Sequence, residues 1–243
     1  MVSEETTIET QILTGDILPA AIGVAVNAFA IIAVIVILFS KQGVANGITF
    51  LVGWIGGLAF VVALVHTLMR TGAAMLSGNP SLDIIQSLLG ILLGLLFLGM
   101  GFAQWRKRPK GGVEEPLPKW LVEADAKVTT GDVITPNRSA SLAFALAALN
   151  PKAIALVLAT SIVVFKSSST FVDTLLDFTT FIVVASLAVA IPVVYRVVGG
   201  ENAQVRLLQW KDWLITHRAV VMAAVLFLLG AMFLLKGLAG LRP

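Results

Sequence analysis

The sequence predicts an all-α integral membrane protein whose six transmembrane helices form two inverted three-helix repeats. Three observations predict this fold: the composition, six apolar segments of membrane-spanning length, and a short phrase that recurs in both halves. Of the 243 residues, 58% are hydrophobic and 13% are charged, and the mean hydropathy is +0.95. Since soluble domains carry about 25% charged residues, almost all of this chain is expected to lie in or beside a bilayer.

Six segments are long enough to cross a membrane, because a helical span needs about 20 mainly apolar residues. They comprise residues 17–39, 46–69, 82–104, 139–165, 174–195 and 219–235. Irregular backbone cannot face lipid, so each segment is expected to be helical. A polar N-terminus, residues 1–16, precedes the first repeat at 17–104, and a loop at 105–138 separates it from the second repeat at 139–243. The N-terminus lacks the basic start of a signal peptide, so the first apolar segment is expected to be retained.

The distribution of lysine and arginine predicts the orientation. The loops after the first, third and fifth segments hold most of these residues, including Arg106, Lys107 and Arg108, whereas the opposite loops hold Arg70 and Lys166. Basic residues concentrate in cytoplasmic loops. The loop at 105–138 is therefore expected in the cytoplasm and both termini outside.

A short amphipathic helix is expected at 203–214, before the sixth segment. Leu207, Trp210 and Leu214 fall on one face of this helix, and Arg206 and Lys211 lie off that face. This pattern is typical of a helix that lies in the membrane interface. We expect it to anchor the fifth loop at the cytoplasmic leaflet, with binding of an anionic lipid headgroup as the weaker alternative.

The recurring phrase reads AVNAFAI at 25–31 and ALNPKAI at 148–154. Each copy opens its half of the chain, and three spans in each half place the halves in opposite orientations. Polar groups and helix breakers at matching places in two such halves point to the central site of a transporter. The phrase therefore predicts both the inverted repeat and the position of a binding site.

The second copy supplies the strongest site candidates, Asn150, Pro151 and Lys152. Pro151 lacks an N–H and should kink or break the helix. A lysine inside hydrocarbon is costly, and a functional role is the default hypothesis for it. Together the three residues could form an anion or headgroup site or a protonation switch; the alternative is a kink whose lysine reaches along a cavity wall. Asn27 would be the counterpart in the first half, or it could simply join helices.

Four residues are weaker candidates. Trp54 is interpreted as a packing residue rather than a substrate contact, and His66 as an interfacial residue rather than a proton relay. Asp177, with Asp173, could attract cations in an outer vestibule, or both could be charges at a helix start. Pro192 could kink a gating helix, although the end of the fifth span is slightly favoured.

Two glycine spacings predict close helix packing: Gly53-x-x-x-Gly57 and Gly90-x-x-x-Gly94. Packing within one subunit is favoured over a homodimer face, which remains the alternative.

Several classes of function are excluded. The chain has no cysteine and two histidines, so cysteine and histidine metal clusters are not expected. It also lacks nucleotide-binding, zinc-protease and nucleophile-elbow motifs, so we expect neither an enzyme nor a cofactor. The net charge of +3 indicates membrane orientation rather than nucleic-acid binding.

Longer stretches resemble a known family. The stretch LNPKAIALVLA resembles the NPK signature of the LysE superfamily of small bacterial exporters. Closer similarity to the GAP family, also called Sap for glycolipid-addressing proteins, is carried by GVANGITFLVGWIGGL, EEPLPKWL and IPVVYRVVGGENAQVRLLQWKDWL followed by AVVMAAVLFLLGAMFLLKGLAGL. The similarity spans residues 17–241.

This resemblance implies a LysE-like fold of six helices, with Asn150, Pro151 and Lys152 in the signature of the second repeat. The first repeat of the family usually breaks at a Ser-Pro-x-Pro type sequence. Residues 26–30 contain no proline here, so a more continuous helix is expected in the first half.

The resemblance further implies a transporter in the bacterial plasma membrane that exports or translocates a lipid, glycolipid or similar amphiphile, coupled to an ion or proton. Its partners would be membrane lipids and the amphiphilic substrate. Two alternatives remain: an exporter of amino acids or cations, and a non-transporting accessory subunit of an envelope-lipid export machine.

Overall fold

The structure, a computed structural model, describes residues 17–76, 82–108, 117–129, 134–167 and 170–241, and these ranges contain helices and no strand. The all-α prediction is confirmed. In chain order the elements are α2 (Ile17–Ala25), α3 (Ala28–Leu38), α4 (Gly43–Leu76), α5 (Leu82–Arg106), α6 (Lys119–Thr129), α7 (Pro136–Ala148), α8 (Pro151–Ser167), α9 (Phe171–Gly199), the 3-10 turn η1 (Gly200–Asn202) and α10 (Ala203–Ala239).

The expected first and fourth spans are each divided into two helices at a sharp bend. The axes of α2 and α3 differ by 49°, and those of α7 and α8 by 61°. The second bend lies directly before Pro151, as expected. The first pair, expected to be more continuous, bends less but is also broken, because Asn27 interrupts the helical backbone without any proline. Its backbone is extended (φ −117°, ψ 94°), and its side chain accepts a hydrogen bond from the Ala30 amide, as an N-cap residue does.

By length and composition, three stretches of the described chain could cross a membrane: Gly43–Thr71, Ser87–Arg106 and Phe171–Ala239. Counting each bent pair as one span raises this number to five. These apolar stretches indicate a membrane-embedded protein.

The helices after residue 170 differ from those expected. Pro192 lies inside α9, which continues to Gly199, so the interpretation of Pro192 as a helix end is wrong. The helix ends instead before Gly200, whose positive φ of 54° is a conformation that glycine adopts readily. The segment at 203–214 and the expected sixth span form one uninterrupted helix, α10. No glycine or proline occurs between residues 203 and 229 to break it.

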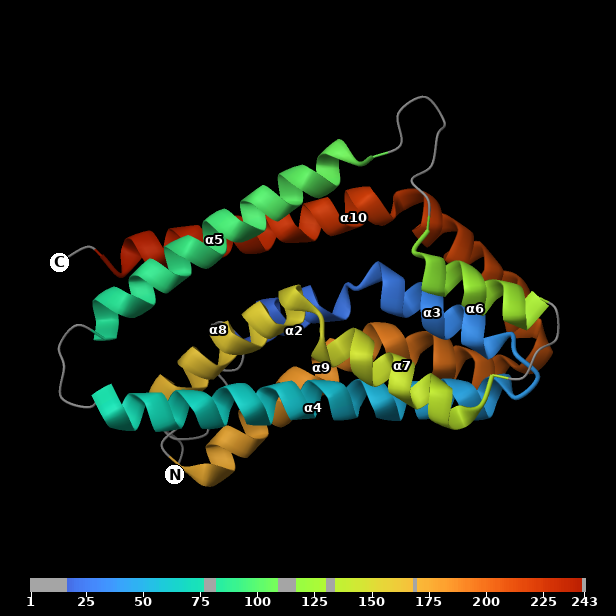
Figure 1. The fold of residues 1–243 in the computed structure, drawn as a ribbon, viewed down its shortest axis with the longest axis horizontal. Helices are drawn as coiled ribbons and strands as arrows, with labels where there is room; N and C mark the ends of the chain where they lie inside the picture. The colour runs from blue at the N-terminus through green and yellow to red at the C-terminus, as the bar shows by residue number, and fades with distance from the viewer. Residues whose placement is uncertain (1–16, 77–81, 109–116, 130–133, 168–169, 242–243) are drawn as a thin grey trace, which may run out of the picture.

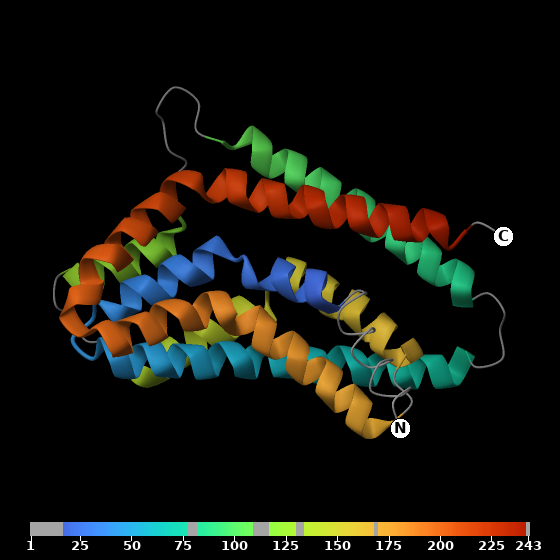
Figure 2. The same cartoon turned by 180° about the vertical axis from the view of Figure 1, so that it is seen from behind.

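The helices α2, α3 and α8 lie between two outer groups of helices. Figures 1 and 2 show α5 and α10 side by side along one edge of the molecule, and α4, α7 and α9 along the other. The helix α3 is apolar on all sides, and its residues Ile32 to Leu38 are all buried. A helix of this kind needs protein on every side, which α10, α9, α4 and α6 supply.

Glycines allow the closest helix contacts. Gly53 and Gly57 of α4 face the α7 backbone, and Gly94 of α5 faces the α10 backbone at Leu234. Both glycine spacings therefore serve packing within one chain, as predicted. The α5–α10 contact is tight on both sides, since Gly237 of α10 lies against α5 in the same way.

Gly94→Val should weaken the α5–α10 pair. A side chain there would place its Cβ 2.6 Å from the Leu234 backbone nitrogen, which cannot rotate away. We expect a loss of about 1–3 kcal/mol of stability, typical of overpacking, measured as a lower thermal unfolding temperature in detergent. Gly99→Val is the matched control, because nothing lies within 4 Å of a Cβ at Gly99. Equal unfolding temperatures for the two variants would contradict this packing.

Candidate functional site

An asparagine begins the second helix of each broken pair in the same way. The Oδ1 atom of Asn150 accepts hydrogen bonds from the amides of Lys152 (3.0 Å) and Ala153 (3.4 Å), at the start of α8. The Oδ1 atom of Asn27 accepts from the Ala30 amide (3.4 Å), at the start of α3. The first amides of a helix have no partner within it, so a side-chain oxygen at this position stabilises the helix start. Pro151 fits the first position of α8, because its missing N–H would be unpaired there anyway.

The two breaks are joined by Lys152. Its Nζ atom donates a hydrogen bond to the Val26 carbonyl oxygen at 2.8 Å, and the side chain is only 3% exposed. The Val26 carbonyl directly follows the end of α2, where the carbonyls of a helix lack partners and carry partial negative charge. The lysine of the second half of the chain therefore satisfies a backbone group freed by the break in the first half.

Lys152 retains capacity for a further ligand. A buried ammonium group needs partners, and a charge-assisted hydrogen bond contributes about 1.5–3 kcal/mol. An ammonium group has three donors, and within the described part of the chain one of them is used, by Val26. The same region supplies no ion pair to this amine.

Lys152 lies on the wall of a cavity of about 530 Å³ between the two halves of the chain. Its lining residues come from α3, α5, α7, α8, α10 and the start of α6: Asn27, Phe29, Met100, Gln104, Pro118, Trp120, Leu142, Ala145, Leu146, Leu149, Asn150, Pro151, Lys152, Met222 and Leu226. Most of these side chains are apolar, and Lys152 carries the one charge among them. The cavity reaches the protein surface beside the α7–α8 break, because Leu149 is 75% exposed and Pro151 is also exposed.

Three donor groups share this cavity. The Oδ1 atoms of Asn27 and Asn150 cap helices. The Nδ2 group of each side chain takes no part in the cap and can donate elsewhere. Neither amide has a partner within the described residues, and neither is fully buried. Together with the Lys152 ammonium, they give the wall three donors and one positive charge, a combination that suits an anion.

The helix α6 covers the end of this cavity that we expect to face the cytoplasm. The sequence predicts a loop at this position rather than a helix. Pro118 and Trp120 form part of the wall, and Leu121 is the buried residue of α6. A salt bridge between Lys211 and Asp125 (3.1 Å) ties α6 to the first turns of α10. The apolar spacing of Leu121, Ala124 and Val128 would have indicated this helix.

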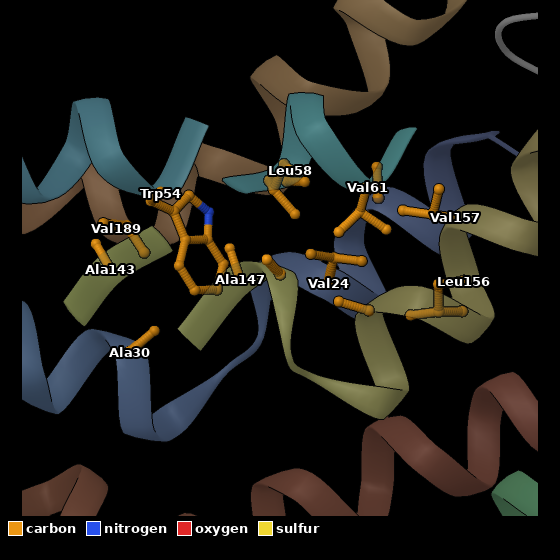
Figure 3. Close-up of a cluster of buried hydrophobic side chains, with 14 of the residues drawn as sticks. Val24, Ala30, Trp54, Leu58, Val61, Ala143, Ala147, Leu156, Val157 and Val189 are labelled. Carbon is orange, nitrogen blue, oxygen red and sulfur yellow. The ribbon is translucent and has the colours of Figure 1, made fainter. Parts of the chain in front are cut away.

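The structure brings together four of the eight candidate residues: Asn27, Asn150, Pro151 and Lys152. The other four lie outside this cavity, and Trp54 is the clearest case. It is fully buried in the core between α4 and α7. Figure 3 shows its ring beside Ala30, Ala143 and Ala147.

His66 lies in the second half of α4, and Asp177 lies near the start of α9. The His66 ring contacts the edge of Phe178 (centroids 5.0 Å apart) and lines a separate polar pocket of about 210 Å³ with Arg70. Asp173 is a charge at a helix start, as its capping box with Thr170 shows. Asp177 is half-buried one turn later. Pro192 is buried within α9.

Comparison with known proteins gives one family. A family model described as SfLAP, "Sap, sulfolipid-1-addressing protein", matches residues 17–239. No curated protein and no solved structure matches the chain. The matched residues include both helix breaks and every residue that lines the cavity.

Asn150→Ala should destabilise the protein by about 1 kcal/mol, because two amides of α8 lose their cap. Asn150→Ser is the matched variant, since serine caps a helix about as well as asparagine. We expect the alanine variant to unfold about 2–4 °C below the serine variant in detergent. An alanine variant as stable as the serine variant would show that the cap contributes nothing.

Proposed function

We propose that this chain is a transporter, which moves a lipid or similar amphiphile with an anionic headgroup across a bacterial plasma membrane. The chain belongs to the Sap (sulfolipid-1-addressing protein) family. The observation that carries this proposal is the buried Lys152 amine on the wall of a mainly apolar cavity. The family name refers to a sulfolipid, and a sulfo group is an anion at neutral pH. The ammonium group and the two asparagine amides would bind such a headgroup, while the apolar wall would receive its hydrocarbon.

The shape and chemistry of the cavity favour an amphiphile over a small hydrophilic solute. Its wall is mostly apolar, and it reaches the surface at Leu149, in the middle of the expected fourth span. An amphiphile could enter there sideways from the bilayer. A cationic solute would meet the like charge of Lys152. Export of a small solute such as an amino acid is the alternative within transport.

Helix pairing supports an inverted repeat with six crossings. If the two repeats are exchanged, α2–α3 takes the place of α7–α8, α4 that of α9, and α5 that of α10. The contact between α4 and α7 then corresponds to the contact between α9 and α2, and the contact between α5 and α10 corresponds to itself. The stretch Phe171–Ala239 contains two long helices, α9 with 29 residues and α10 with 37. Figure 1 shows α10 folding back after η1, so two crossings from this stretch would complete six.

We propose that the basic loops face the cytoplasm and both termini face outward, as the distribution of lysine and arginine predicts. Lys152 would then exchange its hydrogen bond with Val26 for one with the headgroup. Asn27 and Asn150 would orient the headgroup, and Pro151 would maintain the break in the helix. No covalent chemistry is needed for this cycle.

Lys152→Gln should abolish transport, because glutamine keeps a donor for Val26 but removes the charge that binds the headgroup. The assay uses the purified protein in lipid vesicles with phosphatidylglycerol carrying an NBD fluorophore on one acyl chain, and follows its transfer between leaflets by dithionite quenching. Lys41→Gln, which removes an exposed charge outside the cavity, is the control. Transfer at the rate of the unmodified protein by the Lys152 variant would contradict the role of this lysine.

The same vesicles test the accessory alternative. If the unmodified protein transfers the lipid only when a further protein is added, the chain is an accessory subunit rather than a transporter.

Coupling to protons should appear as a response to a pH gradient. With the acidic side on the expected outer face, proton entry would drive export, so the initial rate should rise compared with vesicles that have equal pH on both sides. An unchanged rate would exclude coupling to protons.

A further inference from the structure

A second cavity lies between α5, α8 and α10, nearer the ends of these helices that we expect to face outward. Its volume is about 190 Å³, and nothing above assigns a role to it. It is lined by Ser87, Gly90 and Leu93 of α5, Ala159, Ile162 and Val163 of α8, and Phe233, Lys236 and Gly237 of α10. Figure 1 shows the arrangement of these three helices.

The two cavities stand in register along the same three helices. On α5 the first cavity is lined by Met100 and the second by Leu93; on α8 the corresponding residues are Lys152 and Ala159; on α10 they are Leu226 and Phe233. Each pair is separated by seven residues, about 10.5 Å along a helix. The displacement is the same on all three helices, so the cavities occupy successive levels of one seam.

Buried apolar residues lie between the two levels: Phe97 on α5, Leu156 on α8 and Leu229 on α10. The rings of Phe97 and Phe233 lie 5.8 Å apart. A charged headgroup could pass from one cavity to the other only if such side chains moved, because it would find no polar partner among them.

Like the first cavity, the second places a lysine in a mainly apolar wall. Lys236 brings a positive charge, and the buried Ser87 brings a hydroxyl group, to a wall that is otherwise apolar. A lysine in an apolar wall combines a cation with surface for hydrocarbon. We propose that this cavity, with Lys236 and Ser87, is a second site for the anionic headgroup of the amphiphile, which occupies it after leaving Lys152 and before release at the outer face.

This inference rests on the proposed function and is tested with two lysine variants in parallel. In the vesicle assay, Lys236→Gln should lower the transfer rate of NBD-phosphatidylglycerol by about tenfold or more, as expected for loss of a charge-assisted contact. Lys236→Arg should keep most of the rate, and Lys41→Gln should be unaffected. If Lys152→Gln abolishes transfer and Lys236→Gln does not reduce it, the second site is wrong and the proposed function stands. If neither variant reduces transfer, both proposals fail.

A second measurement does not depend on any variant. Phosphatidylglycerol with a diazirine in its headgroup region is crosslinked to the unmodified protein in vesicles, and the labelled peptides are identified by mass spectrometry. In the unmodified protein we expect labels on the walls of both cavities. In Lys236→Gln the label near Ser87 and Ala159 should be lost, and the label in the Lys152 cavity should remain. Labelling confined to the Lys152 cavity would overturn the proposal and would leave Lys236 as a lysine that extends toward the membrane surface.

Discussion

The hydrogen bond between the Lys152 ammonium and the Val26 carbonyl is the interaction on which the centre of this protein depends. Both groups would be costly alone: the amine is a buried charge, and the carbonyl is a backbone acceptor left by the end of α2. The hydrogen bond gives the buried amine an acceptor and gives the carbonyl a donor. The contact also joins two halves of the chain that the expected repeat would relate, so the stability of the fold and the position of the charge are linked.

The two asparagines explain how a helix can stop inside an apolar bundle and still leave groups for binding. Each uses its side-chain oxygen to cap the helix that follows. The oxygen is the only acceptor of the side chain, so capping leaves the amide donors free to serve a ligand. A break of this kind therefore produces a set of donors and one cation, and none of the described residues that line the cavity is acidic. Such a set suits an anion.

The apolar pattern was sufficient to predict an all-α, membrane-embedded protein, and the recurring phrase singled out Asn27, Asn150, Pro151 and Lys152, which line one cavity in the structure. The break at Asn27 does not follow from the usual sequence signal, because the first copy of the phrase contains no proline and an asparagine cap alone begins a new helix there. The helix α6 lies within residues 105–138, for which the sequence predicts a loop, because prolines and glycines before Lys119 favour irregular backbone. The contributions of Met100, Gln104 and Met222 to the cavity could not be predicted, since they depend on how α5 and α10 pack against the broken helices.

The length of α10 has a mechanical consequence. This one helix of 37 residues holds α6 through Lys211, lines the first cavity at Leu226 and lines the second at Phe233. If α10 pivots on its glycine contacts with α5 at Gly230 and Gly237, which lie near its C-terminal end, the part that carries Lys211 and Leu226 moves furthest. Such a motion would change the first cavity most and the second cavity, beside the pivot, least.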